Sequence, residues 1–238
     1  MSDFVVSSYT PTISTLNHTV KLMGPTADET STRLLLISQP STPGLTLIPA
    51  TEKETHVLKK MFEGKHLASL LNHEDAKTTR VMEEMKTHSW VHFACHAVQD
   101  GNPLKSGIHL YDRRLELLEM MQLKIPYSDH AFLSACQTST GDETLSDEAA
   151  HIAAGMLAVG YRGVIATMWS IGDEHGPEIA EAFYEHILDA SGKGVAKRQL
   201  DGSCAARALD HSIRKFRKKT ENVENALLTW VPYVHFGL

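Results

Sequence analysis

Short apolar runs alternate along the chain with longer segments in which apolar residues recur every three or four positions. Runs of the first kind are typical of strands, and segments of the second kind are typical of amphipathic helices. Strands are expected at residues 34–38, 67–71, 90–95, 108–111, 131–135 and 163–169. Several of these runs are apolar almost throughout, which indicates parallel strands covered on both faces.

The segments between the runs carry helix start and stop signals. Thr51-Glu52-Lys53-Glu54 predicts a capping box, and Gly64 predicts the end of that helix. Further N-caps are expected at Asp75 and Ser146, with Asp147 and Glu148 in the first turn after Ser146, Gly160 ending that helix, and Pro177 at a first helical position. The inward stripes are expected to be Val57, Leu58, Met61 and Phe62; Val81, Met82 and Met85; Ile179, Phe183 and Ile187; and Ala206, Leu209, Ile213 and Phe216.

This alternation of strands and helices predicts an α/β fold with a mostly parallel sheet and helices on both faces. Pro232 lies inside the last apolar run, residues 230–236, which favours an edge strand there because proline cannot donate to a ladder. The length of 238 residues suits one large domain, so we expect residues 1–238 to form a single domain.

Composition narrows the functional classes. The net charge of −6 gives no general attraction for nucleic acid. No apolar run approaches the roughly 20 residues that cross a bilayer, and the N-terminus lacks the features of a signal peptide. We therefore expect a soluble cytoplasmic protein without a nucleic-acid or membrane partner. Charge is uneven: residues 141–190 hold ten acids and one base, whereas residues 191–220 hold nine bases and two acids.

Three cysteines, Cys95, Cys136 and Cys204, are too few and too scattered for a disulfide framework or a zinc ribbon. Free thiols remain, and a thiol can be a nucleophile. We expect neither a metal nor a cofactor.

Two of the predicted strands end in reactive residues. The run at 90–95 leads into His96, and the run at 131–135 leads into Cys136. Reactive groups of an open parallel sheet gather at the carboxyl ends of its strands. If the two strands are neighbours, His96 can take the thiol proton of Cys136 and later protonate a leaving amine. The backbone N–H groups of Ala97 and Cys136, at strand-to-loop turns, can then stabilise the acyl oxygen.

Competing interpretations of these residues are weaker. His92 and His96 have a zinc-like spacing only on a helix, and this segment is β-like. Strand alternation turns Cys95 away from the side of His96, so Cys95 is expected in the core. Ser134 and Ser170 lack the glycines of a nucleophile elbow. The basic cluster 214–219 is either a solvated helix face or a docking surface for an acidic partner.

Several motifs of the chain resemble those of a known family. The resemblance rests on His-Phe-Ala-Cys-His-Ala at 92–97, Leu-Ser-Ala-Cys-Gln-Thr at 133–138, the segment 145–160, Gly-Val-Ile-Ala-Thr-Met-Trp-Ser-Ile-Gly-Asp at 163–173, Phe-Tyr at 183–184 and Ser-Ser-Tyr-Thr-Pro-Thr at 7–12. These motifs are similar to those of CHAT domains, which belong with separases, caspases and metacaspases. The resemblance implies a caspase-like α/β/α sandwich and hydrolysis of peptide bonds, with His96 as general base and Cys136 as nucleophile.

The resemblance also leads to expectations about how the activity is regulated and which substrates are cleaved. Many relatives have glycine where this chain has Ala97, and they usually begin earlier, with another strand and helix; we therefore expect a fragment or a short form. A protein or peptide substrate is implied, and activation by a partner or by a missing N-terminal region is expected. Loops 99–106 and 138–144 are candidate mobile segments. Asp173 and Asp147 are candidates for holding a basic substrate residue. The alternative function is a catalytically silent interaction module.

Overall fold

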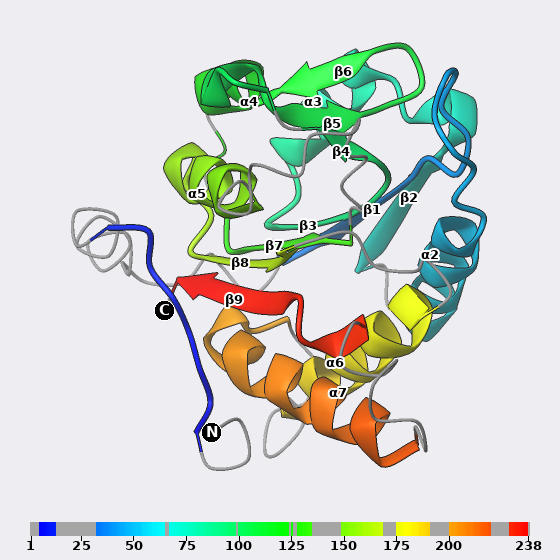
Figure 1. Ribbon diagram of the computed structural model, residues 1–238. Coiled ribbons are helices and arrows are strands. Elements are labelled where there is room, and N and C mark those ends of the chain that lie inside the picture. Colours follow the sequence, from blue (N-terminus) through cyan, green and yellow to red (C-terminus); the bar gives the residue numbers. More distant parts are fainter. Residues whose placement is uncertain are drawn as a thin grey trace.

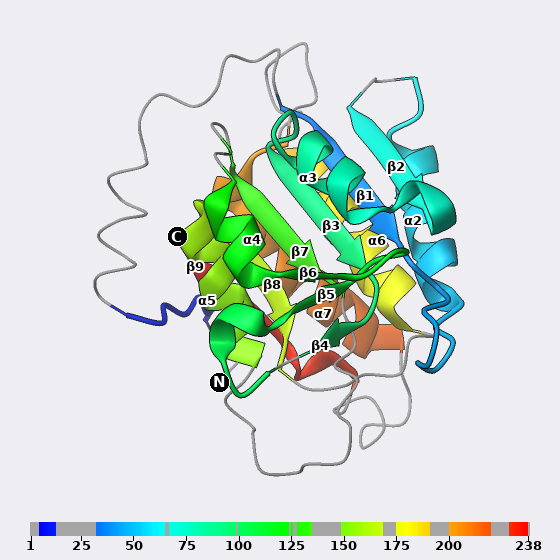
Figure 2. The same cartoon turned by 90° about the horizontal axis from the view of Figure 1, so that it is seen from above.

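A computed structural model of the chain describes residues 5–12, 32–64, 67–98, 100–123, 125, 128–134, 149–168, 175–190, 200–219 and 229–237. Its centre is a sheet with the strand order β2-β1-β3-β7-β8-β9, seen from above in Figure 2. The strands are β1 (Leu34–Ser38), β2 (Ala68–Asn72), β3 (Trp90–Ala94), β7 (His130–Leu133), β8 (Gly163–Thr167) and β9 (Tyr233–Gly237). All neighbours are parallel except β8 and β9, which confirms the predicted mostly parallel sheet.

Helices cover both faces of this sheet (Figure 1). One face is covered by α2 (Ala50–Met61), α6 (Gly176–Ala190) and α7 (Ala205–Lys219), and the other by α3 (Thr78–Met85), α4 (Leu117–Gln122) and α5 (Ala149–Val159). Each strand sends alternate side chains into two separate cores, so Phe93 lies in the α5 core and Trp90 in the α6 core. This is the three-layer α/β/α sandwich.

A small antiparallel sheet follows β3 on the α4 side. It contains β4 (Ala97–Val98), β5 (Gly107–His109) and β6 (Arg114–Glu116), with short 3-10 turns η2 (Pro103–Lys105) beside it and η1 (His73–Asp75) and η4 (Gly202–Cys204) elsewhere. The predicted strand 108–111 is therefore a shorter strand, and it lies outside the main sheet. Position 107 requires glycine, because a Cβ there would clash with the carbonyl oxygen of Leu115.

The edge strand β9 begins after Pro232, as the proline signal predicts. Residues near the N-terminus continue the sheet beyond it: the Tyr9 N–H donates to His235 O at 2.9 Å, and the Gly237 N–H donates to Tyr9 O at 2.8 Å. Two segments at opposite ends of the sequence therefore lie side by side, as Figure 1 shows in blue and red.

Two predicted N-caps are wrong. Helix α2 begins at Ala50, and the Thr51 hydroxyl donates to Ile48 O instead of capping the helix. Asp75 lies in η1, and the first turn of α3 is capped from outside by Asp112, whose carboxylate accepts from the Thr78 N–H at 2.8 Å. Local sequence signals cannot predict this cap, because Asp112 lies far from α3 in the sequence.

The other helix signals give a mixed result. Gly64 and Gly160 have positive φ at the ends of α2 and α5, as expected, and Pro177 is the second residue of α6. The predicted stripe of α6 is buried, but Val57, Met61, Met82, Ala206 and Ile213 are only half-buried. The predicted N-cap Ser146 lies outside the described residues.

Candidate active site

His96 lies just beyond the carboxyl end of β3, and β3 pairs directly with β7. The register places Phe93 opposite Leu133, each the third residue before the reactive position that the sequence proposes on its own strand. The expected adjacency of the two strands is therefore confirmed. Cys136 itself lies outside the described residues, as do Asp147 and Asp173.

The His96 side chain is 1% exposed and makes one hydrogen bond at 2.7 Å, between its Nε2 and the backbone oxygen of Thr46. A carbonyl oxygen only accepts, so Nε2 must carry the proton. Nδ1 of the neutral ring is then a base, and it has no hydrogen-bond partner among the described residues. The loop between β1 and α2 thus fixes the tautomer of His96, which no local sequence signal indicates.

Ala97 follows in β4, opposite Ile108 of β5. The His109 N–H donates to His96 O at 2.8 Å, which makes the preceding pair the hydrogen-bonded one. In an antiparallel ladder such pairs alternate, so the N–H of Ala97 is directed away from β5. The role of this N–H as an oxyanion donor stays a prediction.

A buried polar cluster lies beneath this end of the sheet, and the sequence reading missed it. The Glu54 carboxylate on α2 is 2.9 Å from His92 Nε2 and accepts from the Ser134 hydroxyl at 3.0 Å. His92 Nδ1 lies 3.3 Å from the Tyr184 hydroxyl of α6. Glu54 and His92 are 2% and 0% exposed. Burial, followed by the charge of Glu54, raises the pKa of Tyr184 well above its ordinary value.

One signal could have revealed Glu54. The helical spacing i, i+4, i+8 places it on the same face as Leu58 and Phe62, which are both buried. A capping-box interpretation assigned Glu54 to the helix end instead. Ser134 belongs to the cysteine motif, and its hydroxyl is engaged with Glu54, which agrees with its rejection as a nucleophile.

Cys95 is fully buried in the core on the α5 side, as strand alternation predicts. Burial, and secondarily the charge of Glu54, raises the pKa of its thiol. A thiol in this state forms little thiolate, so Cys95 is a core residue. The predicted burial of Cys95 in the core is confirmed.

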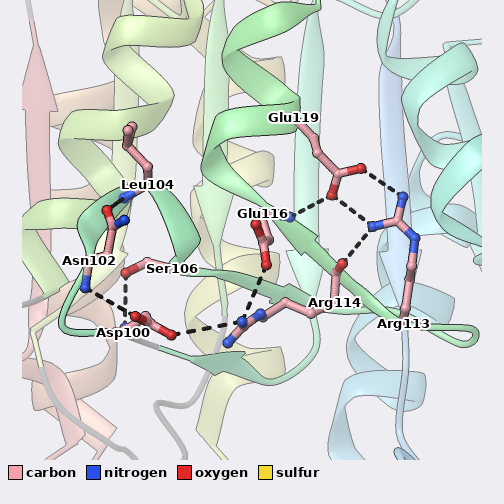
Figure 3. A network of polar contacts seen from close by, with 8 residues as sticks. All are labelled: Asp100, Asn102, Leu104, Ser106, Arg113, Arg114, Glu116 and Glu119. Carbon is pink, nitrogen blue, oxygen red and sulfur yellow. Dashed lines mark hydrogen bonds and ion pairs between the residues drawn. The ribbon is translucent and has the colours of Figure 1, made fainter.

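The connection between β4 and β5 is held by polar contacts, drawn in Figure 3. The Asp100 N–H donates to the Ser106 hydroxyl at 3.1 Å, and Asp100 Oδ2 lies 3.8 Å from the Arg114 guanidinium. Arg113 makes a two-pronged contact with Glu119, both bonds 2.7 Å. The Arg114–Asp100 contact ties residues 100–106, part of the loop 99–106 proposed from sequence as mobile, to β6, and the Leu117 N–H, which donates to Ser106 O at 2.8 Å, ties them to α4. Movement of this loop would have to break them.

The basic face of α7 is largely paired within the fold. Lys215 lies 2.6 Å from Glu185, Arg214 lies 2.8 Å from Asp210, and the Arg217 guanidinium stacks over the Trp230 ring. These contacts favour the solvated-face interpretation of the cluster 214–219 over a docking surface.

Among the described residues, no group of three or more His, Cys, Asp or Glu side chains is arranged to hold a metal ion. In the same part of the chain, no helix is long and apolar enough to cross a membrane. His92, one half of the zinc-like pair, is instead bonded to Glu54.

The sequence of the chain matches a known family, and its fold is similar to those of solved structures. The CHAT domain family matches residues 2–238. No curated protein sequence matches the chain significantly. Among solved structures, the Arg-specific cysteine proteinase gingipain R is similar, with a TM-score of 0.59 and 15% identity over 94% of this chain and 50% of that one.

Separase in the Saccharomyces cerevisiae separase–securin complex is similar as well. One structure of it has a TM-score of 0.58 and 13% identity over 97% of this chain and 14% of separase, and another has a TM-score of 0.61 and 12% identity over 97% and 13%. The chain thus spans about half of gingipain R and about one seventh of separase. Both neighbours are cysteine peptidases of caspase-like fold, and the fold matches theirs. The chain belongs to the CHAT domain family and has a caspase-like α/β/α architecture.

Proposed function

We propose that the protein is a cysteine endopeptidase that hydrolyses peptide bonds through His96 and Cys136. The observation that carries the proposal is the state of His96: Thr46 O holds the proton on Nε2, which leaves Nδ1 as a base at the carboxyl end of β3. Strand β7 is the direct neighbour of β3, and its chain reaches Cys136 two residues after Ser134. Family membership and the caspase-like fold support the same activity.

The chemistry has two halves. His96 Nδ1 takes the thiol proton of Cys136, and the thiolate sulfur attacks the carbonyl carbon of the scissile peptide bond. The C–N bond then breaks, His96 gives its proton to the leaving amine, and a thioester remains on Cys136. Water, deprotonated by His96, hydrolyses the thioester and regenerates the thiol. The N–H groups of Ala97 and Cys136 are the proposed donors to the oxyanion, and neither a metal nor a cofactor takes part in these steps.

Specificity is part of the proposal. Gingipain R is described as Arg-specific. Asp173 and Asp147 supply negative charge within about forty residues after Cys136 in this chain, and a partly desolvated carboxylate–guanidinium pair discriminates more strongly than an exposed one. We therefore propose a basic residue before the scissile bond, held by Asp173 or Asp147. Substrates that differ only in Arg, Leu or Asp at that position test this, with Asp173→Ala as the informative variant.

Burial of His96 supports regulated activity. A general base must come within hydrogen-bond reach of the thiol and the leaving amine, yet this side chain is 1% exposed. We propose that a protein partner, or a region beyond this chain, promotes the movement that admits a peptide. The domain proposed for residues 1–238 would then be the catalytic part of a larger assembly, located in the cytoplasm.

The decisive experiment is labelling with a peptide carrying a thiol-reactive electrophile. The parent is expected to be labelled at Cys136, and His96→Ala is expected to slow labelling by about 100-fold or more, since general-base assistance contributes that much. Cys136→Ala is expected to abolish peptide cleavage while the far-UV circular dichroism stays unchanged. Labelling that does not depend on His96, together with absent cleavage, would identify a silent interaction module instead.

A further inference from the structure

The Glu54 cluster joins three elements that meet below the proposed active site. Glu54 comes from α2, His92 from β3, and Ser134 follows the last residue of β7. His92 lies four residues before His96, and Ser134 lies two residues before Cys136. One carboxylate therefore contacts both segments that lead to the proposed dyad.

Burying this cluster lowers the stability of the fold unless each of its polar groups has a hydrogen-bond partner. A buried carboxylate loses its hydration, and the loss is offset only by well-placed donors. Ser134 Oγ–H donates to Oε2 at 3.0 Å, and His92 Nε2 lies 2.9 Å from Oε1. With its proton on Nε2, His92 can accept from the Tyr184 hydroxyl at Nδ1, so each ring nitrogen has a partner.

The first turn of α6 completes the surroundings of Glu54. A Cβ built on Gly176 would lie 2.9 Å from Glu54 Oε2 and 3.4 Å from Ser134 Oγ. The absent side chain lets the positive end of this helix approach the carboxylate, where negative charge is favourable. Glycine at the start of α6 thus serves the cluster through close approach.

Stability alone is a poor explanation for such a cluster. Buried ion pairs are often replaceable by apolar side chains of similar volume with no loss of stability. Hydrogen bonds differ from apolar contacts in having fixed lengths and directions. From a fixed Ser134, the backbone allows Cys136 Cα a reach of about 7 Å at most. A fixed Ser134 thus limits where Cys136 can lie, and catalysis responds to far smaller displacements, because a misplacement of about 1 Å can cost about 100-fold in rate.

We propose that Glu54 is a positioning residue that ties the chain leading to Cys136 to the strand leading to His96, and so sets the reactivity of the thiol. The inference rests on the proposed function, since it assumes that His96 and Cys136 act together. Glu54 does not touch the reacting atoms in this proposal; it acts through Ser134 and His92.

Charge and position predict opposite shifts in the pKa of the Cys136 thiol. If Glu54 acted only as a nearby negative charge, its removal would lower this pKa, because like charge disfavours a thiolate. If Glu54 holds Cys136 beside His96, its removal weakens the thiolate–imidazolium pair and raises the pKa towards that of a free thiol. Contact with His96 is the stronger influence, so we expect the pKa to rise.

The test measures alkylation of Cys136 by iodoacetamide against pH, resolved by mass spectrometry of the modified peptides. Glu54→Gln is expected to slow alkylation at neutral pH by about 10- to 100-fold and to move the rate profile to higher pH. Ser134→Ala removes one hydrogen bond and is expected to slow it by about 3- to 10-fold. The double variant should be no slower than Glu54→Gln alone, because both changes break the same contact.

Asp129→Asn is the matched control. Asp129 is a half-buried carboxylate, 20% exposed, that accepts from Trp90 Nε1 at 2.9 Å and from the Gly202 N–H at 3.1 Å, but it lies at the amino ends of the strands. The rate of Cys136 alkylation in Asp129→Asn should stay within about two-fold of the rate in the parent at each pH. Half-buried Cys204 serves as an internal reference in every sample.

The outcomes separate the two proposals. If His96→Ala leaves alkylation of Cys136 unchanged, the dyad fails and the role of Glu54 falls with it. If His96→Ala slows alkylation but Glu54→Gln matches Asp129→Asn, or lowers the thiol pKa, the positioning role alone is overturned. Should Glu54→Gln fail to fold by circular dichroism, Ser134→Ala and Gly176→Ala decide, and a parental rate in both overturns the inference.

Discussion

The two ends of the central strands both contain buried histidines and a carboxylate, Glu54 buried at one end and Asp129 20% exposed at the other, but the histidines have different surroundings. At the carboxyl end, His92 is bonded through both ring nitrogens, and His96 is held through one. At the amino end, neither ring nitrogen of His130 has a hydrogen-bond partner among the described residues; the ring stacks on His235 with centroids 5.7 Å apart and on Phe183 at 5.9 Å.

This difference indicates that the histidines at one end serve packing and those at the other end are oriented for proton transfer. Burial holds the pKa of His130 well below its ordinary value, with a further contribution from His235, and burial lowers the pKa of His235 to about 4. His130 therefore behaves as an aromatic core residue, whereas His235 Nδ1 lies 2.8 Å from the Ser8 hydroxyl. At the other end, ring nitrogens are oriented by a carbonyl and a carboxylate, as proton transfer requires. The same residue type thus has different roles at the two ends of one sheet.

The largest effect is expected from the amino-end carboxylate. Asp129→Ala would leave Trp90 Nε1 and the Gly202 N–H without their acceptor and Arg162 without its neighbour at 3.6 Å. Two part-buried donors without partners cost about 2 to 3 kcal/mol in total, which urea denaturation can measure. Alkylation of Cys136 in the folded variant should match the parent. A slowing by more than about five-fold would mean that the two ends are coupled.

Acid should weaken the amino end next. The folded-state pKa values of His130 and His235 lie below that of an unfolded histidine, about 6.5, so the unfolded chain binds protons first as pH falls. Their contribution to stability is complete above about pH 6.5 and declines below it. From pH 7 to pH 5, His235 alone should lower the free energy of unfolding by about 2 kcal/mol.

The control for this prediction is His130→Leu, a change of similar volume in an aromatic and apolar environment. It removes one of the two protonations and should flatten the dependence of stability on pH. Burial raises the pKa of Asp129, although Arg162, Trp90 and Gly202 act against the shift, and a raised carboxyl pKa adds stability as pH falls. Asp129 contributes equally to the parent and to His130→Leu, so its contribution cancels when the slope of unfolding free energy against pH of one is subtracted from that of the other. Identical slopes would contradict the assignment of neutral, buried His130.

The smallest effect is expected at Cys95. Cys95→Ala removes one sulfur atom from a packed core and should cost about 1 kcal/mol. The parent thiol should resist alkylation until the protein unfolds, because it is fully buried. The variant should retain the Cys136 alkylation rate, measured against Cys204 in the same sample. Reaction of native Cys95 as fast as Cys204 would contradict the separation of these neighbouring faces.

Much of the fold was predictable from pattern. Continuous apolar runs identified the strands of the main sheet, although several of their ends moved by one to three residues, and the run at 108–111 belongs to the small sheet. The cap prediction at Asp75 was wrong because Asp112, distant in sequence, caps α3 instead. The cap prediction at Thr51 was wrong because its hydroxyl donates to Ile48 O in the loop before α2. Local signals assign helix and strand type better than they assign the partners of polar side chains.

The sequence by itself determined the family motifs, the alternating strands and helices, and the placement of His96 and Cys136 after two apolar runs. Hydrophobic periodicity is a local property, so it survives in the one-dimensional pattern. Only the tertiary structure decided that Thr46 O fixes the His96 tautomer and that Glu54 joins His92 to Ser134 across 38 and 80 residues of sequence. Such hydrogen bonds depend on distances and angles between elements far apart in the chain, and no local pattern encodes these quantities.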